Sequence, residues 1–173
     1  MPNPWNSAWE EAAASCPPSV AEHCTLELWH ISFDVPVRAV TGVADDMNLT
    51  LEVGAPRNSG ESVTFKAIPF RADFPEVGER MPPQIKVTID NAARELAPYI
   101  DGALNYRGDL VALYREWRSD DLTAPCYGPV EFIIKKVTVV GESVVGVAQI
   151  ANLANRRFPK KNYTLAEFPS LLP

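Results

Sequence analysis

Alternation of apolar and polar side chains predicts β-strands along most of this chain. The clearest segment is Met47–Val53 (MNLTLEV), where every second residue is apolar and is expected to face inward. The first strand is expected over Thr25–Val35, and Pro36 limits it to a sheet edge or a bend, with Val37–Val40 as its continuation. Similar patterns predict further strands at Ser62–Phe70, Gln84–Ile89, Asp109–Trp117, Pro129–Val140 and Ser143–Leu153. The last two strands are joined by a turn at Gly141–Glu142, which predicts a hairpin.

Two short helices are predicted beside these strands. Near the start, Ser7 and Glu10 form a capping box, and the alanine- and glutamate-rich run that follows is stopped by Pro17. A second helix is expected over Ala92–Ile100, directly after an Asp-Asn helix-start signal, with a disturbance at Pro98. Both helices are short, so neither changes the prediction that strands dominate the fold.

Length and composition sharpen this prediction to one mainly β domain. The chain has 173 residues, which suits a single domain. Its 16 prolines are about twice the average usage of roughly 5%, and they exclude a helical bundle. We therefore predict a single β-sandwich or barrel-like domain with two short helices and extended N- and C-terminal arms. The expected boundaries are an N-terminal arm with the short helix (1–23), a β-rich body (24–153) and a C-terminal arm (154–173).

The C-terminal arm differs from the body in charge. The formal net charge is −6, which opposes nucleic-acid binding by the chain as a whole. From residue 152 onward four cations and one carboxylate give +3, so the rest of the chain carries −9. A basic arm on an acidic body favours docking onto another copy or a partner over a merely solvated tail or a grip on nucleic acid. The candidate interface residues of this arm are Arg156, Arg157, Phe158, Lys160, Lys161, Tyr163 and Phe168.

The N-terminal arm carries a second candidate contact. Trp5 and Trp9 are four residues apart, so a helix extended by one turn would place both rings on one face. The two rings could pack onto the domain itself, or they could dock onto a neighbouring subunit. We include both residues in the expected subunit interface. No stretch of 18 apolar residues and no signal-peptide pattern occurs, so neither a membrane span nor a secretory leader is expected.

Catalytic and metal-binding patterns are sparse, and neither an enzyme nor a metal or cofactor site is expected. The three cysteines predict free thiols, although Cys16, His23, Cys24 and Cys126 could in principle form a metal site. His30 lies within an expected strand, where a structural role is favoured over a catalytic one. The acidic pairs Asp45–Asp46 and Asp120–Asp121 are typical of solvated turns.

Three segments resemble an uncharacterised family encoded in the tail gene clusters of tailed bacteriophages. They are Leu26–Ile31 (LELWHI), Val63–Phe70 (VTFKAIPF) and Pro83–Asn91 (PQIKVTIDN). The layout of residues 24–160 is also similar to the N-terminal part of the lambda tail-tip protein L, an upper hub protein. The chain lacks the cysteine-rich C-terminal extension with the iron–sulfur ligands of the lambda-like protein, so no cluster is expected.

The resemblance implies a structural protein of a siphophage-type tail tip, located in the virion after synthesis in the host bacterial cytoplasm. Such a protein would be an upper baseplate hub or adaptor that joins the distal-tail ring to the central hub and fibre protein. It would form a homo-oligomeric ring, with a trimer favoured over a hexamer. Two alternatives stay open. The first is a hexameric distal-tail ring subunit, and the second is a small tail-associated hydrolase that uses Cys24 with His23 or Cys126 with His30.

Overall fold

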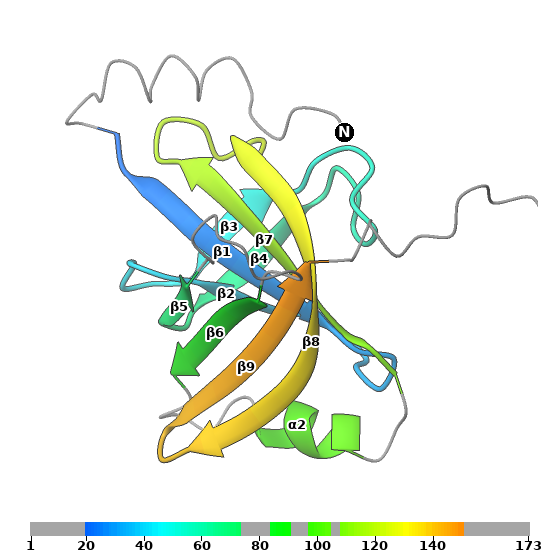
Figure 1. Cartoon of the computed structure of the whole chain (residues 1–173). Helices are drawn as coiled ribbons and strands as arrows, with labels where there is room; N and C mark the ends of the chain where they lie inside the picture. The colour runs from blue at the N-terminus through cyan, green and yellow to red at the C-terminus, as the bar shows by residue number, and fades with distance from the viewer. Residues whose placement is uncertain (1–19, 74–83, 91–96, 105–107, 151–173) are drawn as a thin grey trace, which may run out of the picture.

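The computed structural model describes residues 20–73, 84–90, 97–104 and 108–150. Their strands form one nine-stranded sheet in the order β3-β4-β2-β1-β7-β8-β9-β6-β5 (Figure 1). One helix, α2 (Ala97–Leu104), lies at one end of the sheet. The strands, in chain order, are β1 (Glu22–Trp29), β2 (Val37–Val40), β3 (Met47–Thr50), β4 (Ser62–Ala67), β5 (Phe70–Asp73), β6 (Gln84–Asp90), β7 (Leu110–Arg118), β8 (Tyr127–Val140) and β9 (Ser143–Ile150).

The sheet is strongly curled, because strands at opposite ends of its order are joined by only two residues. β4 is second in the order and β5 is last, yet only Ile68 and Pro69 separate them in the chain. The backbone N–H of Phe70 donates to Thr41 Oγ1 at 3.4 Å, just after β2, and Asp90 N–H donates to Pro69 O at 2.8 Å. The bent β4–β5 segment therefore links the β2 side of the sheet to the β6 side.

The inner face of the curled sheet holds the main core. Strand alternation places Leu26 and Leu28 of β1 opposite Tyr114 and Ala112 of β7, and all four are buried. β8 adds Phe132, which is fully buried. Each large side chain buried in this way contributes roughly 1.5–3 kcal/mol. The other buried members of this cluster are Phe33, Val37, Ala39, Phe70, Ile85, Val87, Ile89, Ile134, Val144 and Ala148.

A second, smaller core lies on the opposite face of β1, β2 and β7. Val40 and Trp117 project from that face, and the β3–β4 hairpin covers them with Leu49, Leu51 and Phe65. The Phe65 and Trp117 rings meet edge-to-face with their centroids 5.6 Å apart. The β3–β4 hairpin therefore forms a second layer over one part of the sheet.

A buried cluster of charges ties the loop after β3 to this same face. Arg115 of β7 is fully buried, and its Nε and Nη2 each donate to a carboxylate oxygen of Glu52 at 2.9 Å. Its Nη1 donates to Glu27 Oε2 at 3.1 Å. Arg38 Nε lies 3.5 Å from the same oxygen of Glu27, and Arg57 Nη1 lies 4.0 Å from the other. The side chain of Glu27 is fully buried, so these three cations replace the water that it has lost.

Two further contacts hold the same loop in place. The guanidinium carbon of Arg57 lies 3.9 Å from the centre of the Trp29 ring, a cation–π geometry. Arg38 Nη2 donates to Asn58 Oδ1 at 2.7 Å. Asn58 has a positive φ of 53°, a conformation that asparagine tolerates better than most residues. The predicted turn-rich loop at 54–60 is thus anchored by side chains from β1 and β2, while Arg115 of β7 holds Glu52 just before it.

The mainly β prediction is confirmed, but the first predicted strand is too long. β1 ends at Trp29, because the chain turns where Phe33 N–H donates to His30 O at 2.9 Å. β2 then returns antiparallel to β1 rather than continuing it. The turn leaves Ile31 72% exposed, although it lies within the predicted first strand.

Two other strand predictions also need correction. β3 ends at Thr50, and Val53 is 93% exposed instead of facing inward, because the chain has already entered the loop. The strand predicted over 62–70 is interrupted near Pro69, and its last residue begins β5. The hairpin turn predicted at Gly141–Glu142 is confirmed, and Gly141 adopts a φ of 59° there.

The structure describes part of only one of the two predicted helices. Of the helix predicted over 92–100, residues 92–96 lie outside the described residues; α2 covers 97–104 and so continues past the predicted end at Ile100. Pro98, where a disturbance was expected, is the second residue that α2 covers. The predicted N-terminal helix also lies outside the described residues. No helix in the described parts of the chain is long and apolar enough to cross a membrane.

Candidate functional site

The interface residues predicted from the sequence lie outside the described residues. These are Trp5 and Trp9 in the N-terminal arm and the seven basic and aromatic residues of the C-terminal arm. The structure therefore does not place them relative to the sheet. The candidate sites that it does define are an apolar cavity, an unpaired strand edge and a group of buried thiols.

The buried thiols are not arranged as nucleophiles. Cys126 Sγ donates to the backbone oxygen of Glu116 at 3.2 Å, and burial raises the pKa of Cys126 to about 11. Burial also raises the pKa of Cys24, so both thiols stay protonated near neutral pH. Tyr114 donates to Glu116 Oε1 at 2.7 Å, and burial raises the pKa of that carboxyl group. Cys126 and Tyr114 are buried, whereas Cys24 and Glu116 are partly buried, and all four lie near the start of β1.

The pairings required by the hydrolase hypothesis are not present. His23 and Cys24 are adjacent in β1, so their side chains point to opposite faces of the sheet. Cys126 lies near Glu116, the register partner of Cys24, whereas His30 follows six residues after Cys24, roughly 20 Å along an extended chain. Among the described residues, no group of three or more His, Cys, Asp or Glu side chains could hold a metal ion.

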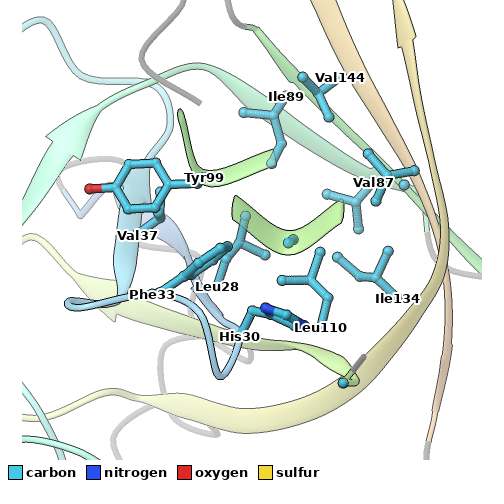
Figure 2. A pocket seen from close by; sticks show the side chains of 14 residues that line it. Leu28, His30, Phe33, Val37, Val87, Ile89, Tyr99, Leu110, Ile134 and Val144 are labelled. Carbon is cyan, nitrogen blue, oxygen red and sulfur yellow. The ribbon is translucent and has the colours of Figure 1, made fainter. Parts of the chain in front are cut away.

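The apolar cavity lies inside the curled sheet, at the end that α2 covers. Its volume is about 260 Å³. α2 contributes Tyr99 and Ala103, which are four residues apart and therefore lie on one face of the helix. The sheet and its loops supply the other lining residues (Figure 2), namely Leu28, His30, Phe33, Val37, Val87, Ile89, Gly108, Leu110, Ile134, Val137, Val144 and Gly146.

His30 brings a polar group to this apolar lining. Its side chain lies among apolar side chains (Figure 2), and the residue is only 2% exposed. Nδ1 accepts a hydrogen bond from Ser32 N–H at 3.2 Å and lies 2.7 Å from Ser32 Oγ. Because Nδ1 is an acceptor, the neutral ring carries its hydrogen on Nε2. Nε2 faces Gly108, where an added Cβ would lie only 3.0 Å away, and no described residue offers it a hydrogen-bond partner.

Aromatic contacts hold the helix against the cavity. The Phe33 and Tyr99 rings meet edge-to-face at 5.1 Å between centroids, and His30 and Phe33 meet similarly at 5.7 Å. At the rim, Val137 lines the cavity and is also 39% exposed. The cavity is therefore partly open to solvent, and Val137 places an opening where β8 extends past β7.

The unpaired edge belongs to that extension of β8. The pairing of β7 with β8 ends at Leu110 and Ile134, whereas the pairing of β8 with β9 continues to Val140. From Lys136 to Val140, the side of β8 that faces away from β9 has no strand partner among the described elements. Three valines of this segment are exposed to solvent, namely Val137, Val139 and Val140. A free edge with exposed β-branched side chains is suited to pairing with a strand of another chain.

One of these two sites could have been found from the sequence. The predicted strand 129–140 is longer than the predicted strand 109–117, so an overhang was implied if the two strands pair. Its last residues are apolar on both faces, which is unusual for a solvent-exposed strand end. The cavity left no such signal, because its lining comes from segments far apart in the chain.

Comparison with protein families shows which family the chain belongs to. A family model described as a domain of unknown function, DUF1833, matches residues 8–163, so the chain belongs to this family. The match includes all nine strands and α2. A search of curated proteins gives no significant match.

Proposed function

We propose that this member of the DUF1833 family is a structural component of a siphophage-type tail tip. In this role it is an upper baseplate hub or adaptor that joins the distal-tail ring to the central hub and fibre protein. The sequence resemblance described above suggests the role. The observation that carries it is the free, apolar edge of β8, which offers a ready surface for assembly with another chain. A curled, barrel-like domain with assembly segments at its edge and ends suits this function.

Assembly through the edge follows from its backbone geometry. Gly141 and Glu142 form a two-residue turn, so Val140 and Ser143 close the hairpin as a hydrogen-bonded pair. Antiparallel pairs alternate, so the N–H and C=O groups of Val139 and Val137 point away from β9, toward the free edge. A strand from a neighbouring subunit would satisfy these groups and cover the exposed valines. A ring built in this way adds contact area without changing the fold of each subunit.

The test is a substitution that blocks the edge without disturbing the core. Val139→Lys places a charge at a position that is 56% exposed, where it should not affect folding. Val53→Lys is the matched control, because Val53 is 93% exposed and lies in the loop after β3. We expect tails carrying Val139→Lys to assemble poorly and tails carrying Val53→Lys to assemble normally. Infectious tails at wild-type yield from both variants would refute an assembly role for this edge.

The predicted C-terminal arm supplies a second, separate test. Deleting residues 154–173 should leave a folded body, as measured by circular dichroism, but should prevent the formation of infectious tails. Normal tails from the truncated gene would remove this segment from the interface. The chain's position and copy number in a virion reconstruction separate the upper hub from the distal-tail ring. Three-fold density favours the hub, and six-fold density favours the ring.

The hydrolase alternative has less support. The protonated thiols, of which Cys126 is buried and Cys24 partly buried, and the separation between Cys126 and His30 argue against a cysteine nucleophile. Replacing Cys24 and Cys126 by serine in the phage should leave plating unchanged. A loss of plating with tails that still assemble would revive the enzymatic hypothesis.

A further inference from the structure

We infer that the cavity beneath α2 is a binding site for a small, uncharged aliphatic molecule that carries one hydrogen-bond acceptor. The cavity lies inside the sheet, and its occupancy does not require the proposed assembly role, although Val137 belongs both to the cavity rim and to the free edge of β8. The volume of the cavity, the chemistry of its lining and the Nε2 group of His30 carry the inference.

The volume sets the size of the ligand. An apolar cavity of about 150 Å³ in a protein core stays dry and accepts benzene, which has six carbons. On that scale, the cavity of about 260 Å³ holds about ten non-hydrogen atoms. A cavity of this size left empty would lose the dispersion contacts of its whole lining. An aliphatic chain would restore those contacts.

The lining sets the polarity of the ligand. Aliphatic and aromatic side chains dominate it, from Leu28 and Val37 on one side to Ile134 and Val144 on the other. The described lining contains no lysine or arginine, so a carboxylate would lose its water without gaining a cation. An uncharged head group, such as an alcohol or an ester, avoids that penalty.

His30 sets the position of the head group. The residue is almost completely buried, and its Nδ1 is already occupied by Ser32, so Nε2–H is the donor available for a ligand. No described residue accepts a hydrogen bond from Nε2, and a ligand oxygen would supply that acceptor. The aliphatic part would then lie against Tyr99 and Ala103 of α2. The rim at Val137 offers a route from solvent into the cavity.

The test uses the full chain, calorimetric titration and three eight-carbon probes. 1-Octanol should bind with one site per chain. 1-Chlorooctane has a similar shape but a poor acceptor, and we expect it to bind about five-fold more weakly, the equivalent of one hydrogen bond. Octanoate should bind more weakly than 1-octanol at pH 8. Equal affinity for all three probes, or no binding of 1-octanol, would overturn the inference.

Two variants localise the binding. Val144→Phe fills part of the cavity, because Val144 lines it and is 6% exposed. Val139→Phe is the matched control, because Val139 is the cross-strand partner of Val144 but lies outside the lining and is 56% exposed. We expect 1-octanol binding to weaken about tenfold or more in the first variant and to change less than about twofold in the second. Ala103→Leu fills the same space from α2 and replaces Val144→Phe if that variant does not fold. Unchanged binding in the folded cavity variant would refute the site.

Discussion

Replacing Glu27 by glutamine is the sharpest test of the charge cluster that anchors the second layer. The side chain of Glu27 is fully buried, and its carboxylate has three cationic neighbours. Arg115 is closest at 3.1 Å, followed by Arg38 at 3.5 Å and Arg57 at 4.0 Å. Glutamine keeps the shape and one acceptor oxygen, and it replaces the charge and the second oxygen by an amide NH2 group.

The expected loss in the free energy of unfolding follows from burial. Removing one partner from a buried ion pair costs about 3–5 kcal/mol, because the remaining charges stay away from water. Here Arg115 would keep Glu52 as its carboxylate partner, but Arg38 and Arg57 would lose the carboxylate of Glu27, so repulsion among the three guanidinium groups adds to the loss. Since glutamine can still accept a hydrogen bond from Arg115, we expect about 3 kcal/mol. For a chain of this length, that lowers Tm by roughly 6–12 °C.

Urea unfolding monitored by tryptophan fluorescence measures this loss. The midpoint should fall while the slope m stays constant, since the area exposed on unfolding is unchanged. Asp109→Asn is the matched control, because Asp109 pairs with Lys135 at 3.4 Å in an exposed setting and should lose less than about 1 kcal/mol. If Glu27→Gln loses no more than this control, the buried cluster does not stabilise the fold.

Two further predictions concern a glycine and a thiol. Gly128 has a φ of 96°, and a Cβ there would lie 2.6 Å from Tyr114 O, so Gly128→Ala should destabilise the protein by about 2–3 kcal/mol. Gly141 has open space around it, so the control Gly141→Ala should cost about 1 kcal/mol. Equal losses of stability in thermal unfolding of the two variants would contradict the clash at Gly128. Cys126 has a pKa of about 11, raised above its unfolded value near 9, so the stability it contributes is present below pH 9 and is lost as the pH rises to 11. Urea unfolding between pH 9 and pH 11 should show this decline in the free energy of unfolding of the wild type and a smaller decline in Cys126→Ala. The same dependence of that free energy on pH in both proteins would refute the contribution of Cys126.

The sequence was sufficient where a local pattern and the tertiary environment agree. β6 and β7 lie within one residue of their predicted bounds, because β6 alternates regularly between buried and more exposed residues and β7 is packed on both faces. The hairpin at Gly141–Glu142 was predictable, because a glycine there permits the left-handed backbone of a tight turn. The sequence failed where the chain leaves the sheet while the apolar pattern continues, as at Ile31 and Val53.

The candidate sites needed long-range information. The free edge of β8 exists because β7 begins at Leu110, which leaves the last residues of β8 without a neighbour. His30 is buried, but it lies just after the end of β1 rather than within the expected strand, and its place in the wall of a cavity was not predictable. That wall combines residues of β1, β2, β6, α2, β7, β8 and β9.

The sequence by itself determined the strand content and the absence of a helical bundle, because side-chain alternation and proline act on the local backbone. The tertiary structure decided how the sheet curls, which strand edge stays open and which side chains surround the cavity. These depend on pairings such as Arg115 with Glu52 and on the bend at Pro69, which join residues far apart in the chain. Local propensities do not encode such pairings, because their energy arises only when distant segments are already packed together.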